Sequence, residues 1–142
     1  MIKIKLIKET NGKEIVKGYE KIYGSIDRLK RIVKRNPNDK KAYYDLDDWK
    51  YFKVHLDEKV KETDVLNKEN FTFSKIEIDI LDAVKNKHPS SISELAKFVN
   101  RKSGNILDKV YKLEKEGFVN LKSGAKNKKT PVLKYDKIEI II

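Results

Sequence analysis

The sequence predicts an α+β fold, because stretches with strand periodicity and stretches with helical periodicity follow one another along the chain. Apolar residues alternate with lysines from Ile2 to Leu6, and every second residue from 138 to 142 is an isoleucine. Between these two ends, several segments carry apolar residues at spacings of three and four, which is the period of a helix. With 142 residues, of which 39% are hydrophobic, the chain is long enough for a small domain with an appendage.

The two terminal strands are expected to pair with each other. A strand that stood alone would leave a row of unpaired backbone groups beside an apolar face, which promotes aggregation. Pairing removes this hazard, whether it occurs within one chain or across a dimer. It would also join the N-terminal region to the C-terminal one.

Residues 1–70 are predicted to form a small N-terminal α+β extension. After the first strand, Asn11-Gly12 is typical of a turn, and residues 15–19 suit a second strand that would complete a hairpin. Ser25 is a suitable N-cap for a helix over residues 26–35, and the Asn-Pro pair that follows would end that helix.

Residues 40–66 are compatible with two structures. Their aromatic and aliphatic residues recur at spacings of three and four, which favours a helix. Residues 49–54, however, have high strand propensity, so a strand is the alternative to a helix there. The apolar surplus of this segment makes the extension a candidate dimerisation region.

Residues 71–142 are predicted to form a second domain that begins with three helices. Ser74 is a suitable N-cap for the first helix, which would end near Lys87 and carry the additional apolar residues Ile78 and Leu81 away from its main apolar face. The second helix is expected to start at Ser93. The third is expected to be capped by Ser103 and to end at a glycine in the left-handed conformation.

A cationic hairpin is predicted to follow the helices. Residues 118–121 and 132–135 suit two strands, and the loop of residues 122–130 carries four lysines among small residues. Residues 97–134 hold eleven basic and three acidic residues, a net charge of +8 in a chain whose net charge is +11. A flexible, cationic loop suits an anionic polymer better than a small substrate.

The segments Ser91–Ala96 (Ser-Ile-Ser-Glu-Leu-Ala), Asn105-Ile106 and Leu113–Val119 (Leu-Glu-Lys-Glu-Gly-Phe-Val) resemble the winged helix-turn-helix of prokaryotic regulators. The multiple-antibiotic-resistance and arsenical-resistance repressors share this layout. The run Tyr135-Asp136-Lys137-Ile138 is similar to a strand that follows the wing in a group of archaeal proteins assigned to DNA binding. The resemblance covers about residues 71–142. The chain has no cysteine, so the metal sensing of the arsenical branch is not implied.

The resemblance implies that the third helix enters the major groove of DNA and that the hairpin is a wing. Asn105 can pair with adenine, and Gly104 allows the backbone to approach closely. Asp108 would repel phosphate, so we expect it to accept from a cytosine or to pair with Arg101 or Lys112. The residues expected to contact DNA are Arg101, Lys102, Ser103, Gly104, Asn105, Asp108, Lys109 and Lys112 of the third helix, and Lys122, Lys126, Lys128 and Lys129 of the hairpin.

No catalytic, cofactor or metal site is predicted. The sequence lacks glycine-rich nucleotide-binding motifs, and its two histidines do not have the spacing of metal ligands. The acidic cluster Asp45, Asp47 and Asp48 suits a solvated or helix-capping role. No apolar run approaches the ~18 residues of a membrane span, and no signal peptide is recognisable. We therefore expect a cytoplasmic protein that is neither an enzyme nor bound to a membrane.

The sequence thus predicts a sequence-specific regulator of transcription, a repressor that binds double-stranded DNA as a homodimer and is of archaeal type. The alternative is a winged-helix module that binds protein, such as an antitoxin-like protein or a subunit of the transcription machinery. Salt separates the two hypotheses, because binding to phosphates weakens steeply with salt and an apolar protein interface does not.

Overall fold

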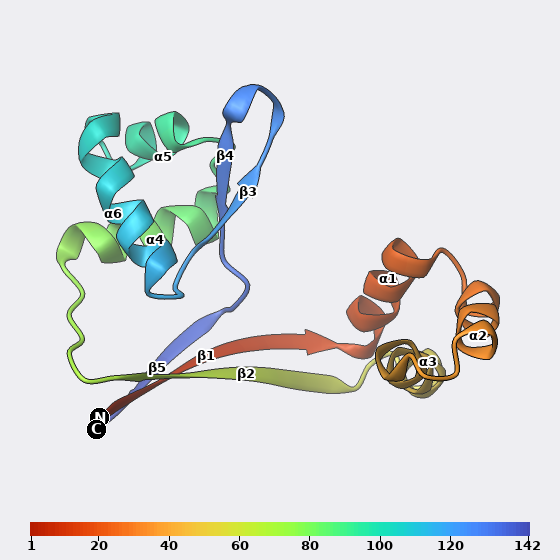
Figure 1. Ribbon diagram of the computed structural model, residues 1–142. Helices are drawn as coiled ribbons and strands as arrows, with labels where there is room; N and C mark the ends of the chain where they lie inside the picture. Colours follow the sequence, from red (N-terminus) through yellow and green to blue (C-terminus); the bar gives the residue numbers. More distant parts are fainter. The chain divides into compact units, whose positions relative to one another are not determined.

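The computed structural model describes all 142 residues and confirms the α+β class (Figure 1). Helices and strands alternate in small groups along the chain. In order, they are β1 (Ile2–Asn11), α1 (Gly12–Tyr23), α2 (Ile26–Arg35), α3 (Lys40–Lys53), β2 (Lys59–Lys68), α4 (Lys75–Lys87), α5 (Ile92–Phe98), α6 (Ser103–Lys115), β3 (Asn120–Ser123), the 3₁₀ turn η1 (Ala125–Asn127), β4 (Lys129–Val132) and β5 (Lys137–Ile141). None of these helices is both long and apolar enough to cross a membrane.

The chain divides into two compact units. One consists of residues 1–8 and 63–142, and we call it the C-terminal unit; the other consists of residues 9–62, and we call it the helical unit. This division differs from a boundary at residue 70, because the first strand and the end of β2 belong with the C-terminal part of the chain.

Helices α1, α2 and α3 pack together in the helical unit around Trp49. The buried residues of this core are Leu29, Ala42, Leu46 and Trp49. Tyr19 stacks on Trp49 with ring centroids 5.9 Å apart. Each helix begins at a residue whose side chain accepts a backbone N–H, and these caps are Asn11, Ser25 and Asp39.

One expectation for this region was wrong, and the structure decides between the two alternatives for residues 49–54 in favour of the helix. Residues 15–19 lie in helix α1 and not in a strand, because Asn11 caps a helix through the N–H of Glu14, 2.9 Å away, instead of forming a hairpin turn. The strand-prone segment from Trp49 to Lys53 lies in helix α3, because Trp49 and Leu46 then face the same core. The strand in this part of the chain comes later, as β2.

Strands β2, β1 and β5 form a three-stranded sheet in this order, and most of its residues belong to the C-terminal unit. Strands β1 and β5 are antiparallel, with Ile4 opposite Ile140 and Leu6 opposite Ile138. The expected pairing of the two ends of the chain is therefore confirmed, and it occurs within one chain. Ile4 and Leu6 are buried, so one face of β1 contributes to the core.

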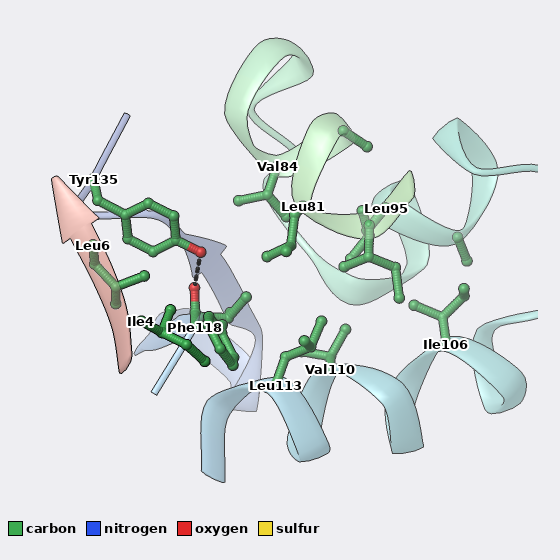
Figure 2. Packing of buried hydrophobic residues seen from close by; sticks show 14 residues of the cluster. Ile4, Leu6, Leu81, Val84, Leu95, Ile106, Val110, Leu113, Phe118 and Tyr135 are labelled. Atoms are coloured by element: carbon green, nitrogen blue, oxygen red, sulfur yellow. Dashed lines mark hydrogen bonds between the residues drawn. The ribbon is translucent and has the colours of Figure 1, made fainter. Parts of the chain in front are cut away.

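Helices α4, α5 and α6 build the rest of that core (Figure 2). Their inward residues, which include Leu81, Leu95 and Leu113, meet Phe118 and Ile4. Leu81 is buried in this cluster, whereas Ile78 on the same helix is 52% exposed. The two additional apolar positions of this helix thus have different surroundings.

The starts of α5 and α6 correct two further expectations. Helix α5 begins at Ile92 and is capped by Ser91, whose hydroxyl accepts the N–H of Glu94 at 3.1 Å, so Ser93 is not the cap. Helix α6 begins at Ser103, and its N-cap position is occupied by Lys102 without a side-chain hydrogen bond. The expected cap at Ser74 is confirmed.

The Tyr135-Asp136-Lys137-Ile138 run connects the hairpin β3–β4 to the sheet. The Tyr135 hydroxyl donates to the Phe118 carbonyl at 2.8 Å (Figure 2). The Asp136 N–H donates to the Ile7 carbonyl at 2.7 Å, and the Asp136 carboxylate pairs with Lys85. Burial raises the pKa of the Tyr135 hydroxyl, so this group stays a proton donor at neutral pH.

Candidate nucleic-acid interface

The turn between α5 and α6 fixes the outward face of α6. Asn100 adopts the left-handed conformation with φ of 58°, and the Arg101 N–H donates to the Ala96 carbonyl at 2.9 Å. The opposite face of α6 is anchored by three residues with no exposed surface, Ile106, Val110 and Leu113. Residues 100–105, which comprise the turn and the first three residues of α6, are all exposed.

The hairpin places its lysines at an exposed tip. Ser123 and Lys129 are the last paired residues, and residues 124–128 form the loop. The Gly124 N–H donates to the Lys128 carbonyl at 2.7 Å, which closes the loop. Lys126 has a φ of 57°, in the left-handed region, so its backbone turns sharply at the tip. Lys122, Lys126, Lys128 and Lys129 are all exposed.

Two contacts hold the hairpin against the helices. The Lys129 ammonium lies 5.0 Å from the centre of the Tyr111 ring and donates to the Tyr111 hydroxyl at 3.2 Å. The Thr130 hydroxyl donates to the Ser90 carbonyl at 2.9 Å. Between the start of α5, the side of α6 and the hairpin lies a hollow of about 430 Å³, lined among others by Ser93, Tyr111 and Lys128. The hairpin and α6 therefore present one continuous surface.

The cations of this surface have no acidic partners. Seven of the expected contact residues form no ion pair, namely Arg101, Lys102, Lys109, Lys122, Lys126, Lys128 and Lys129. The only specific partner among them is the Tyr111 ring beneath Lys129. Unpaired cations that lie close together repel one another, and a polyanion is the kind of partner that relieves this repulsion.

Lys112 differs from the other expected contact residues. Its ammonium donates to both oxygens of Glu77, at 3.0 and 3.1 Å, and lies 3.8 Å from Glu116. Glu77 is 2% exposed, and its Oε1 also accepts the Ser74 hydroxyl at 2.8 Å. The structure thus gives Lys112 an intramolecular role that ties α6 to α4, and it does not bring this ammonium together with the unpaired cations.

The electrostatics of this pair favour the two charged forms. Burial of the Glu77 carboxylate acts to raise its pKa, but the hydrogen bonds from Lys112 and Ser74 outweigh burial and hold the pKa below the ordinary value of a glutamate. The hydrogen bond to Glu77 raises the pKa of Lys112. The Ser-x-x-Glu pattern predicts the contact between Ser74 and Glu77. No local pattern predicts Lys112, which is 35 residues further along the chain.

The remaining expected residues of α6 are at its solvent-facing start and side. Asp108 is exposed and forms no ion pair, so its expected pairing with Arg101 or Lys112 does not occur. Gly104 has no heavy atom within 4 Å of the position of an added Cβ, so an approaching molecule meets open space there. Ser103 and Asn105 are exposed beside it. Tyr111, which supports Lys129, was not among the expected site residues, because an aromatic residue on a helix gives no sequence signal for such a contact.

Comparison with known proteins places this surface within one matched segment. Residues 72–140 match the model of the family described as HVO_A0114. The match covers α4 to β4 and most of β5, and so includes the whole candidate interface. No curated protein and no solved structure matches the chain.

Proposed function

We propose that α4, α5, α6 and the hairpin β3–β4 form a winged helix-turn-helix that binds double-stranded DNA, and that the protein regulates transcription as a repressor. The observation that carries the proposal is the unpaired cationic surface that α6 and the hairpin share. Three further features agree with binding of DNA by a helix and a wing. They are the order of the helices, the exposed start of α6, and the basic hairpin that Tyr111 supports. In the HVO_A0114 match, the same elements lie within a single matched segment.

In the proposed complex, the start of α6 enters the major groove. Asn105 pairs with the exposed edge of an adenine, and Arg101 binds a guanine or a nearby phosphate. The lysines of the hairpin bind phosphates, which gives affinity without sequence preference. Lys112 is not one of the contacts, because its ammonium is bound to Glu77.

We further propose that two copies of the chain bind DNA together. One winged domain reads only a short site, and paired domains read two half-sites. The exposed apolar residue Ile78 and the outer edge of the sheet at β5, with Ile140 50% exposed, are surfaces on which a second copy would bury apolar area. Sedimentation equilibrium of the wild type and of Ile78→Glu tests this assembly. A wild type that remains monomeric at micromolar concentrations contradicts it.

Selection of bound fragments from a random duplex pool tests the function itself. An enriched sequence is expected, and Asn105→Ala should weaken binding to that sequence by about 1–3 kcal/mol while changing binding to random DNA much less. Asn67→Ala is the matched control, since Asn67 is an exposed asparagine on β2 of the same unit. Equal weakening on both kinds of DNA would show that Asn105 reads no base. A selection that enriches nothing would contradict a sequence-specific regulator.

A further inference from the structure

The arginines of the chain are distributed very unevenly. Of 33 basic residues, only four are arginine, and three of these lie on one ten-residue helix, α2. They are Arg28, Arg31 and Arg35, and the fourth is Arg101 at the start of α6. A chain that otherwise uses lysine for its positive charge therefore uses arginine almost only on one helix of the helical unit. Arginine differs from lysine because its planar guanidinium binds carboxylate or phosphate through two parallel hydrogen bonds.

The three arginines form a row along the exposed side of α2. At about 100° per residue, positions 28, 31 and 35 fall within ~60° of one another, on the side turned away from the apolar face. All three side chains are exposed. The apolar face is occupied, because Leu29 is fully buried and packs with Leu46 and Trp49. The helix therefore offers only its cationic side to a partner.

Contacts within the chain do not account for this row. None of the three arginines forms an ion pair, and the only ion pair on α2 joins Lys30 to Asp27 at 3.9 Å. Cations are favourable in the last turn of a helix, but Arg28 lies in the first turn, where the helix dipole opposes a positive charge. Like charges three and four residues apart also destabilise a helix. The row is thus unfavourable for the isolated protein, and an anionic partner would offset this cost.

We infer that the row Arg28, Arg31 and Arg35 binds successive phosphates on the backbone of double-stranded DNA, as a second contact outside the winged domain. Seven residues of helix span about 10 Å at ~1.5 Å per residue. One strand of DNA carries a phosphate every ~3.4 Å along its axis, so a row of this length, with its long side chains, can reach more than one phosphate. An anionic membrane is the less favoured partner, because a helix that binds a membrane inserts its apolar face, and this face is buried. The inference rests on the proposed function only in its choice of DNA as the polyanion.

The test uses the full chain with the triple substitution Arg28→Gln, Arg31→Gln and Arg35→Gln. Binding to a duplex is measured at several salt concentrations. The slope of log affinity against log salt should flatten by about 0.9 for each lost phosphate contact, or up to about 2.7 in total. The matched control is Lys13→Gln, Lys17→Gln and Lys21→Gln, which removes the same charge from three exposed, unpaired lysines on α1 of the same unit. Equal flattening in both variants would overturn the inference, because net charge alone would then explain the effect. An unchanged slope in the arginine variant would overturn it as well.

Two further variants sharpen the result. The triple substitution Arg28→Lys, Arg31→Lys and Arg35→Lys should lower the affinity severalfold while the salt slope stays near that of the wild type, because charge is kept and bidentate binding is lost. Lys126→Ala, Lys128→Ala and Lys129→Ala separate the two proposals. If only the arginine variant weakens DNA binding, the inference about the row is supported and the proposal that the hairpin lysines bind phosphates is contradicted. If only the hairpin variant weakens DNA binding, the inference about the row is contradicted. Binding of the chain to vesicles with anionic lipid that depends on the arginines, without an effect on DNA, would assign the row to a membrane and overturn the inference. A wild type that does not bind duplex DNA overturns both proposals.

Discussion

Replacing Lys112 by methionine tests whether this residue serves the fold or the DNA. The substitution keeps most of the aliphatic stem and removes the ammonium, which leaves the buried Glu77 carboxylate with hydrogen bonds from the Ser74 hydroxyl and the Ser74 backbone. An unsatisfied buried partner costs about 1–3 kcal/mol, and more when it is charged. The Lys112 side chain is 40% exposed, so water reaches part of the pair, and we therefore expect a loss of about 1–3 kcal/mol in the free energy of unfolding. At about 3 °C per kcal/mol for a chain of this size, the melting temperature should fall by about 3–9 °C.

The choice of assay follows from the position of the single tryptophan. Trp49 lies in the core of the helical unit, so its fluorescence reports on residues 9–62 and not on the Glu77–Lys112 contact. Hydrogen exchange of α4 and α6 reports on the contact directly, and circular dichroism gives the melting temperature. Trp49 fluorescence then serves as a check that the helical unit remains folded in the variant.

Lys109→Met is the control on the same helix. Lys109 forms no ion pair, so this change should alter stability by less than ~0.5 kcal/mol. It should weaken DNA binding and flatten the salt slope by about 0.9, whereas folded Lys112→Met should keep the wild-type slope. If Lys112→Met leaves stability unchanged and flattens the salt slope, the assignment of Lys112 to the fold is refuted.

The stability difference between the wild type and Lys112→Met should also depend on pH. The folded state lowers the pKa of Glu77, so the contribution of this carboxylate is present above the ordinary pKa of a glutamate and is lost as the pH falls through the folded value. The difference should therefore be largest at neutral pH and should narrow on acidification. A difference that grows as the pH falls would contradict the sign of this pKa shift.

Two further predictions concern the sheet and its connection to the hairpin. Deleting residues 1–7 removes the partner of β5 and the buried residues Ile4 and Leu6, so the melting temperature should fall and residues 137–141 should lose protection from hydrogen exchange; retained protection would show that another segment covers this strand. Tyr135→Phe removes a buried hydrogen bond to a main-chain carbonyl and should cost about 0.5–1.5 kcal/mol in urea denaturation, and an unchanged midpoint would mean that this hydroxyl contributes nothing to stability.

Features that depend on local patterns were predictable from the sequence. The α+β class followed from periodicity, and the pairing of β1 with β5 followed from the hazard of two exposed alternating strands. The cap at Ser74 was also correct, because a capping serine acts on its own neighbours. The start of α5 was less accurate, since the helix begins at Ile92 and is capped by Ser91, whose hydroxyl accepts the N–H of Glu94.

Apart from the pairing of β1 with β5, features that depend on contacts between distant segments were not predictable. Residues 15–19 satisfy a strand pattern locally, but in the fold they belong to α1. There, Tyr19 of α1 stacks on Trp49 of α3, which is 30 residues further along the chain. Lys112 lies on the exposed side of α6 by periodicity alone, and only the packing of α4 brings the buried Glu77 to it. The support of Lys129 by Tyr111 likewise depends on how the hairpin folds back onto the helix.

The central claim is that the unpaired cations of the hairpin bind the phosphates of DNA. The most direct measurement is the salt dependence of duplex binding by Lys126→Ala, Lys128→Ala and Lys129→Ala, compared with the wild type and with the α1 lysine control. The account predicts weaker binding to every duplex, little change in sequence preference, and a slope flattened by about 0.9 for each lost contact. An unchanged slope in this variant, with the wild type binding DNA normally, would contradict the claim.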